Sequence, residues 1–299
     1  ATTIDVQSNA HLAGLSNGNY IVTWDDMSGV GGDNSGSAAR GQLIGSNGVK
    51  IGAELLLSAS LTNGDQSDAK VVALSSGAFA VTWSSVQATG SSLTGEIRSQ
   101  VYTTTDSSIT KVGAETVVAT GTPNIPLNHE LSALSNGGYV ISWTDQNSTV
   151  SDVKGQLYTS QGVKVGSVID INSTTNDSQG AAKVAGLVNG GFVAVWNDMS
   201  KGMDNPDVKA QVFNDTGAKV GAEITLGNVN ANLQSNPAVL ALSNGNFAVT
   251  WEEQAGQNMG IHEQVFSAMG QSLGAEILVN SVQTATSQDM ASTHDGGFA

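Results

Sequence analysis

Acidic and amide side chains gather in the polar loops that follow two of the five tryptophans, Trp24 and Trp196. A hard cation such as Ca²⁺ needs roughly six to eight oxygen ligands from a flexible loop, and carboxylate and amide groups supply them. The sequence therefore predicts loop sites for Ca²⁺, the one cofactor we expect. The alternative is a set of solvated turns in which Asp and Asn bond the local backbone. The candidate ligands are Asp25, Asp26, Asp33, Asn34, Asp198, Asp204, Asn205 and Asp207.

Other reactive residue types show no catalytic spacing. The histidines, His11, His129, His262 and His294, share no metal-type spacing such as H-E-x-x-H, so no zinc site is predicted. The sequence has no G-x-S-x-G nucleophile elbow and no phosphate-cradling glycine loop. A carboxylate pair assembled from distant segments, as in some glycosidases, stays open. No catalytic residue is therefore predicted.

A recurring glutamate follows a recurring basic residue in a glycine-centred phrase. We interpret these charges as decoration of outer strands that discourages edge-to-edge pairing, in preference to a ring of carboxylates. The glutamates are Glu54, Glu115, Glu223 and Glu276, and the lysines are Lys50, Lys111, Lys164 and Lys219.

The charge balance limits the possible partners. Eleven Lys and Arg against 26 Asp and Glu give a net charge of −15, which disfavours nucleic acid and anionic lipid surfaces. The absence of cysteine excludes disulfides and thiolate metal sites. No stretch approaches the ~20 apolar residues of a membrane span. Both ends of the sequence are abrupt, so we expect a window from a longer polypeptide.

One phrase recurs five times and contains every tryptophan of the chain. Its period is 53 to 60 residues, which indicates a repeat architecture. The copies are LSNGNYIVTW (Leu15 to Trp24), LSSGAFAVTW (Leu74 to Trp83), LSNGGYVISW (Leu134 to Trp143), LVNGGFVAVW (Leu187 to Trp196) and LSNGNFAVTW (Leu242 to Trp251).

Each copy reads as four β-strands. A short apolar run leads through Asn-Gly into the tryptophan phrase, and Asn-Gly favours a type I′ hairpin between the first two strands. A third strand carries Gln followed by apolar and aromatic residues, as in Gln100 to Tyr102, and a fourth carries the glycine-centred phrase, as in Lys111 to Glu115. The tryptophan strand is apolar on both faces and therefore needs cover on both. No segment shows helical periodicity.

Sheets of this kind can bury their faces by stacking around an axis. We therefore predict an all-β fold, a β-propeller of four-stranded antiparallel blades, with aromatic side chains between neighbouring blades. Residues 1–299 form one repeat domain in this interpretation, with residues 1–7 as a fourth strand and 289–299 as a first strand and the start of a second. The five complete repeats span about 10–65, 66–125, 126–178, 179–233 and 234–286, and residues 287–299 with 1–9 form a partial sixth.

The repeat phrase resembles a known group of proteins. Its pattern GG-aromatic-V-x-x-W, followed by Gln-apolar-aromatic and G-x-x-x-G-x-E, resembles repeats of large secreted and cell-surface bacterial proteins of the haemolysin-type, calcium-associated (RTX-like) kind. This resemblance covers nearly the whole chain and implies a secreted or cell-surface bacterial location, and often calcium. The chain departs from that group because it has no G-G-x-G-x-D tandem, the nearest string being Gly31 to Gly36.

Three functions remain open at this stage. Our first expectation is a non-enzymatic extracellular module of a bacterial surface, adhesin or matrix protein that provides scaffold and interaction surface. The alternative is a glycan-binding, lectin-like propeller, although every aromatic falls at a recurrent position that we expect to be buried. A second alternative is a propeller-fold glycoside hydrolase with an acid pair facing the axis. The expected partners are glycans, or other copies of the chain through open blade edges.

Overall fold

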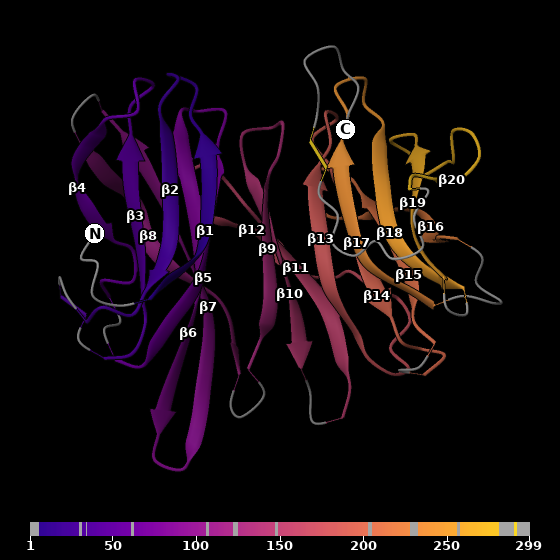
Figure 1. The fold of residues 1–299 in the computed structure, drawn as a ribbon, viewed down its shortest axis with the longest axis horizontal. Helices are drawn as coiled ribbons and strands as arrows, with labels where there is room; N and C mark the ends of the chain where they lie inside the picture. The colour runs from indigo at the N-terminus through magenta and orange to yellow at the C-terminus, as the bar shows by residue number, and fades with distance from the viewer. Residues whose placement is uncertain are drawn as a thin grey trace. The chain divides into compact units, whose positions relative to one another are not determined.

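The computed structural model describes residues 6–29, 32–33, 35–60, 63–105, 108–121, 125–146, 149–202, 205–227, 233–255, 258–280 and 290–291. Within these ranges the chain forms twenty strands in five antiparallel four-stranded sheets (Figure 1). No helix in the described part of the chain is long and apolar enough to span a membrane.

The five sheets are the predicted blades, and each is built from four consecutive strands. Blade 1 is β1 (Gln7–Gly14), β2 (Tyr20–Asp26), β3 (Ala38–Ile44) and β4 (Lys50–Leu56). Blade 2 is β5 (Asp65–Ala73), β6 (Ala78–Thr89), β7 (Ser92–Thr104) and β8 (Ile109–Gly121). Blade 3 is β9 (Leu127–Ala133), β10 (Tyr139–Gln146), β11 (Ser151–Tyr158) and β12 (Lys164–Asp170). Blade 4 is β13 (Gln179–Gly186), β14 (Phe192–Asp198), β15 (Asp207–Phe213) and β16 (Lys219–Thr225), and blade 5 is β17 (Leu233–Ala241), β18 (Phe247–Ala255), β19 (Asn258–Phe266) and β20 (Ile277–Leu278).

The chain divides into two compact units. One comprises Ala1–Leu127, Gly137–Tyr139 and Tyr158–Lys164, and the other comprises Asn128–Asn136, Val140–Leu157 and Val165–Ala299. Blades 1 and 2 therefore belong to the first unit, and blades 4 and 5 with most of blade 3 belong to the second.

The ends of the chain differ from the prediction where they are described. Gln7 was expected in a fourth strand, but it begins β1, the first strand of blade 1. Residues 1–5, 281–289 and 292–299, which hold most of the predicted partial sixth repeat, lie outside the described residues.

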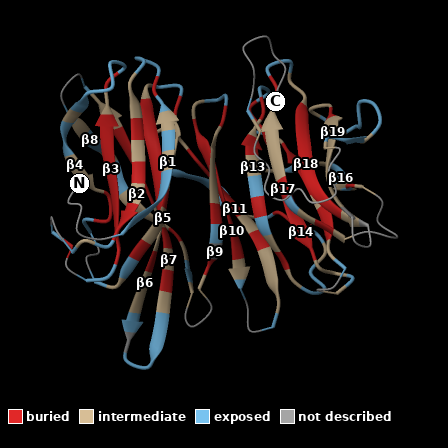
Figure 2. Ribbon diagram, in the orientation of Figure 1, coloured by how far each residue is buried: buried red, intermediate tan, exposed pale blue. Residues whose placement is uncertain are grey.

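In blade 4 the central strands β14 and β15 are buried at all positions but one, whereas the fourth strand β16 is exposed or half-buried along its length (Figure 2). Within the first unit, Phe79 and Trp83 of blade 2 pack on Ile21 and Leu43 of blade 1. The tryptophan face of a blade therefore packs on the opposite face of the blade before it. In the second unit, Phe192 and Trp196 pack on Val140 and Leu157, and Phe247 and Trp251 pack on Val193 and Val212. In blades 2, 4 and 5 this arrangement confirms the prediction that tryptophan and its aromatic companions lie between neighbouring sheets.

The hairpin between the first two strands forms as predicted, but with a different turn. In blade 1 the N–H of Gly18 donates to Leu15 O at 3.0 Å, and the N–H of Leu15 donates to Asn19 O at 2.7 Å. Gly18 has a φ of +82°, whereas Asn17 is not among the residues with positive φ. The connection is thus a type I turn closed by a left-handed glycine, and the type I′ prediction is wrong.

A bulge in the first strand of blades 2 and 4 is hydrogen-bonded to the preceding blade. One residue of the bulge takes a left-handed φ near +50° in every blade, at Asn9, Asp68, Asn128, Ala181 and Asn236. The bulge of blade 2 turns its backbone toward blade 1, where the Asp25 carboxylate accepts from the N–H groups of Asp68 (3.1 Å) and Ala69 (3.4 Å). In blade 3, Thr144 Oγ1 likewise accepts from the N–H of Ala181 in blade 4 at 3.3 Å. Asp25 follows Trp24 and Thr144 follows Trp143, so in both cases the residue after the tryptophan binds the first strand of the following blade.

The recurring glutamine and the recurring glycine both belong to a bulge between the third and fourth strands of a blade. The glycine of the fourth strand has a positive φ, 70° at Gly221, and the pairing with the third strand shifts register there. The side chain of Gln211 fills the gap, because its Nε2 donates to Val212 O and to Val220 O, both at 3.0 Å. Equivalent bonds are made by Gln42, Gln100 and Gln156.

We expect Gln211→Ala to lower the free energy of unfolding by about 1–3 kcal/mol, because the buried carbonyl of Val212 and the half-buried carbonyl of Val220 lose their donor. Urea unfolding followed by tryptophan fluorescence measures the change. The control is Gln161→Ala on an exposed turn, for which a change below about 0.5 kcal/mol is expected. Equal effects of the two substitutions would show that the hydrogen bonds of Gln211 across the bulge contribute nothing to the free energy of unfolding.

Candidate functional site

A line of polar side chains crosses the four strands of blade 4 at the end of its tryptophan face. Gln179 Nε2 donates to Asp198 Oδ1 at 2.6 Å, and Gln179 Oε1 accepts from Trp196 Nε1 at 3.0 Å. Asp198 forms an ion pair with Lys209, and Lys209 Nζ lies 3.5 Å from Glu223 Oε2. We call this arrangement, with one member from each strand, the polar row of the blade.

The ions of the row stabilise one another. Burial raises the pKa of the Asp198 carboxyl, but hydrogen bonds from Lys209, Gln179 and Ser200 more than offset this and leave the pKa below its ordinary value. Burial likewise lowers the pKa of Lys209, and the Asp198 and Glu223 carboxylates raise it above its ordinary value. Both groups are therefore held in their charged forms.

Three other blades place a permanent cation at the same row position, two residues before the recurring glutamine. In blade 1, Arg40 Nε lies 2.5 Å from Asp26 Oδ2. In blade 2, Arg98 pairs with Glu115 at 2.5 Å and with Glu96 at 2.6 Å. In blade 3, which has Val168 where the recurring glutamate would stand, Lys154 pairs with Asp170 at 2.5 Å.

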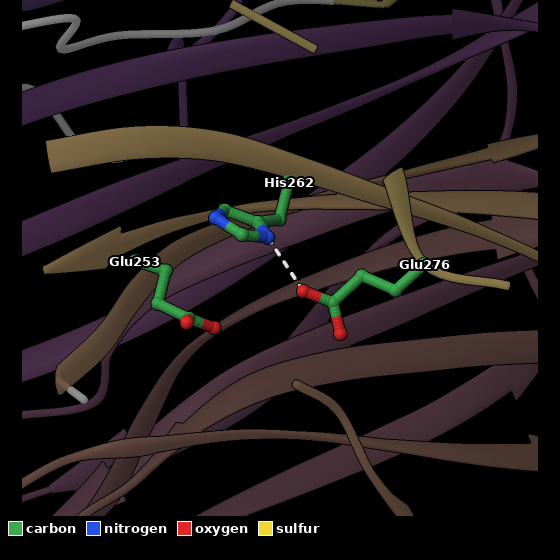
Figure 3. Close-up of side chains that lie close together, drawn as sticks. All are labelled: Glu253, His262 and Glu276. Carbon is green, nitrogen blue, oxygen red and sulfur yellow. Dashed lines mark hydrogen bonds and ion pairs between the residues drawn. The ribbon is translucent and has the colours of Figure 1, made fainter. Parts of the chain in front are cut away.

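Blade 5 has a histidine at this position. His262 Nδ1 lies 2.5 Å from Glu276 Oε1, and the three ligand atoms of Glu253, His262 and Glu276 all lie within 4.8 Å of one another (Figure 3). Among the described residues, this is the group of three His, Cys, Asp or Glu side chains that could hold a metal ion. The His262 ring stacks on Trp251, with ring centroids 5.9 Å apart. No zinc-type spacing is visible in the sequence here, because the three residues come together only when the sheet folds.

The candidate calcium ligands of the first loop have protein partners. Asp25 holds the bulge of blade 2, and Asp26 pairs with Arg40. Asp33 accepts from the N–H of Ser35 at 3.1 Å, and burial raises the pKa of its carboxyl. Asn34 lies outside the described residues.

The candidates of the fourth loop are also distributed over separate contacts. Asp198 belongs to the polar row, and Asp207, its cross-strand partner, pairs with Lys201 at 2.8 Å. Asn205 is exposed, and its N–H donates to Gly202 O at 3.0 Å. Asp204 lies outside the described residues. Calcium binding by these loops stays a prediction.

The recurring glutamates differ from the interpretation as edge decoration. Glu115, Glu223 and Glu276 point to the basic residue of the third strand and complete the polar row. Glu54 pairs with Lys50 at 3.2 Å on the fourth strand, as the interpretation requires. Sequence spacing alone missed the row because its members are far apart in the chain.

A pocket of about 460 Å³ lies on the tryptophan face of blade 1. Trp24 is half-buried there, whereas the other four tryptophans are at most 3% exposed. The apolar floor is formed by Val22, Trp24 and Ile44, and polar side chains surround it. These include Gln7, Asn9, Lys50 and Glu54, and we call the site the Trp24 pocket.

The sequence contains a signal for this pocket. In the other blades the aromatic of the second strand stacks on an aromatic of the third, as Phe192 does on Phe213 at 4.5 Å. In blade 1 the partner of Tyr20 is Ile44, so that the second ring is missing. The expectation that every aromatic is buried is therefore wrong for Tyr20 and Trp24, which are half-buried.

Comparison with known proteins places the fold. No protein-family model and no curated protein sequence matches the chain. Among solved structures, the chain is similar to a GH93 α-L-arabinofuranosidase of Fusarium graminearum in complex with arabinobiose (TM-score 0.60, 17% identity, 97% of this chain and 86% of that chain). It is also similar to an α-L-arabinanase of Penicillium chrysogenum complexed with arabinobiose (TM-score 0.59, 16% identity, 97% and 86%). A protein of unknown function from Dyadobacter fermentans matches with a TM-score of 0.56 at 13% identity over 92% and 83% of the two chains.

The likeness establishes the architecture predicted from the repeats, an all-β propeller of four-stranded blades. It also corrects our functional expectation. We expected a non-enzymatic scaffold module, but the similar propellers named above include an α-L-arabinofuranosidase and an α-L-arabinanase. The resemblance to haemolysin-type repeats and the secreted or cell-surface location stay predictions.

Proposed function

We propose that the chain is a carbohydrate-acting propeller of the glycoside hydrolase class, and that the Trp24 pocket holds part of its glycan. The observation that carries this proposal is a half-buried tryptophan within a ring of amide and charged groups, in a pocket of about 460 Å³. Ligand sites of small molecules commonly have such a volume, with an apolar lining and a few polar groups that set orientation. The similar structures that contain arabinobiose suggest arabinose-containing oligosaccharides as the substrate class.

The chemistry of the pocket suits a sugar. A pyranose or furanose ring has an apolar C–H face, which can lie on the indole of Trp24, and hydroxyl groups that need donors and acceptors at the edge. Gln7 and Asn9 supply amide groups at that edge, and Lys50 and Glu54 supply charged ones. Protein contacts hold these groups in place, because Asn9 Nδ2 donates to Asp25 Oδ2 at 2.7 Å and Lys50 pairs with Glu54 at 3.2 Å.

Hydrolysis of a glycoside requires two carboxyl groups, one that protonates the leaving oxygen and one that acts on the anomeric carbon or on the attacking water. Glu54 lines the pocket, and Asp26 lies one hydrogen bond from its wall, since Gln7 Nε2 donates to Asp26 Oδ1 at 3.0 Å. Water adds across the cleaved C–O bond in the net reaction. Glu54 is the acidic residue among those that line the pocket, and we assign it a role in this chemistry.

We expect Trp24→Ala to weaken the binding of arabino-oligosaccharides about 30-fold, the effect of removing an aromatic that contributes roughly 2 kcal/mol to binding. Isothermal titration calorimetry with arabinobiose and longer oligosaccharides measures this. Tyr20→Phe, which keeps the ring of the other half-buried aromatic of β2, is the matched control. Unchanged affinity in Trp24→Ala would contradict the proposal. So would a concentration-dependent dimer that Trp24→Ala dissociates, because the tryptophan face of blade 1 would then pack against a blade of another copy.

Glu54→Gln should abolish release of arabinose from the same oligosaccharides and preserve their binding. Glu223→Gln, the equivalent position in blade 4, should retain turnover because it lies outside the pocket. Chromatography of the reaction products gives the readout. Binding without any turnover by the unmodified chain would overturn the enzymatic part of the proposal and leave the sugar site.

A further inference from the structure

The blades provide an internal comparison for the row position that His262 occupies. Blades 1 to 4 place Arg40, Arg98, Lys154 and Lys209 there, and each pairs with at least one carboxylate. Arginine and lysine keep their charge at any physiological pH, whereas an imidazole changes charge within that range and is also a metal ligand. Blade 5 therefore keeps the two carboxylates of the row, Glu253 and Glu276, but has His262 in place of the lysine or arginine.

The three side chains of blade 5 form a donor set for a transition metal. One imidazole nitrogen and two carboxylate oxygens lie within 4.8 Å of one another, close enough for small shifts to bring them onto one ion. Three protein ligands of this kind with a fourth open position are typical of Zn²⁺, whereas Ca²⁺ would need more oxygens than the row supplies. The strands β18 and β19, paired Trp251 to His262, hold two of the ligands in fixed register.

Neighbouring groups orient the ligands. Trp251 Nε1 donates to Glu253 Oε2 at 3.4 Å, and its ring stacks on the His262 imidazole. Outer contacts of this kind fix the direction of metal ligands and contribute to affinity. Glu253 is 6% exposed, so the site is shielded on that side.

An independent observation points to a ligand at this site. In blade 4, Gln179 donates to Asp198 and accepts from Trp196. Its counterpart Gln234 is fully buried and uses Oε1 for the N–H of Val208, but its Nε2 has no hydrogen-bond partner. Gln234 Nε2 lies close to the Glu253 carboxylate, because a Cβ placed on Gly227 would come within 2.2 Å of Gln234 Nε2 and within 2.8 Å of Glu253 Oε2. A buried donor beside a ligand carboxylate is suited to an oxygen bound to a metal ion.

We propose that the polar row of blade 5 binds one divalent transition-metal ion of the zinc class through Glu253, His262 and Glu276. The ion takes the electrostatic place that a lysine or arginine side chain takes in the other blades. It would tie β18 and β19 to the segment that carries Glu276, and so stabilise the last blade. This site shares no residue with the Trp24 pocket and does not depend on the proposed enzymatic function.

The test uses the full chain freed of metal with a chelator and titrated with Zn²⁺ by calorimetry and by thermal unfolding. We expect one zinc ion per chain and a rise in melting temperature of roughly 5 °C at saturating zinc. His262→Lys restores the cation of the other blades, so it should fold with an unchanged or higher melting temperature and lose zinc binding by at least about tenfold. Glu276→Gln should also lose it, and Glu223→Gln in blade 4 should bind as the unmodified chain does.

Two results would overturn the proposal. One is no saturable zinc binding by the chelator-treated chain. The other is zinc binding of equal affinity in His262→Lys and Glu276→Gln, which would place the ion elsewhere. If His262→Lys does not fold, His262→Gln removes the imidazole without adding charge, and retention of zinc binding in that variant counts against the site in the same way.

Discussion

Trp196→Ala should lower the free energy of unfolding by about 3–5 kcal/mol, the usual loss for a large aromatic removed from a packed core. Trp196 is fully buried and packs with Phe192, Phe213 and the facing residues of blade 3. The substitution also removes the donor to Gln179 Oε1, so a buried acceptor loses its partner. Chemical denaturation followed by circular dichroism measures the change without relying on the deleted fluorophore.

Trp24→Ala is the matched control, because the same residue type at the same repeat position is half-buried in blade 1. Its expected cost is about half as large or less, since part of the indole is in contact with the open Trp24 pocket. A cost for Trp24→Ala equal to that for Trp196→Ala would mean that the face of blade 1 is covered as fully as the others. That result would also remove the sugar site proposed above.

The repeat phrase was sufficient to predict the fold. All five tryptophans fall at one position, and strands that are apolar on both faces must be covered by their neighbours, which leads directly to stacked blades. The turn type was beyond this reasoning, because Asn-Gly is compatible with both a type I′ turn and a type I turn closed by a left-handed glycine. The bulge in the first strand was also missed, since Ala181 takes the left-handed conformation where other blades use Asn or Asp.

The site was less predictable than the fold for a physical reason. Asp198 meets Lys209 across the regular pairing of β14 and β15, and Glu223 meets Lys209 across β15 and β16, whose register shifts at a bulge. Register is not visible in spacing along the chain. The Asp and Asn clusters after the tryptophans looked like cation ligands, but Asp25 and Asp26 are used to hold the backbone of the next blade and an arginine. Once the row is known, the substitution of His262 for a lysine or arginine can be read from the sequence.

The polar row makes a second strong prediction. Asp198→Ala should lower the free energy of unfolding by about 3–5 kcal/mol at neutral pH, because it leaves the largely buried Lys209 with only the more distant Glu223 as a counter-charge. Asp215→Ala, on an exposed turn of the same blade, should change it by less than about 0.5 kcal/mol. Urea denaturation of the three proteins gives the comparison.

The pH dependence separates the ionic contribution from simple loss of packing. The pKa of Asp198 is lower in the folded chain than its ordinary value, so the stability that this carboxylate contributes is complete above about pH 4 and is lost as the pH falls through the folded pKa. The pKa of Lys209 is raised, so its contribution persists to high pH and is lost only as the pH rises through that raised value. The difference in unfolding free energy between the unmodified chain and Asp198→Ala should therefore be constant near neutral pH and shrink as the pH falls below about 4. A difference that does not change down to about pH 2 would mean that the side chain of Asp198 acts through its shape and hydrogen bonds, and that its charge contributes little to the row.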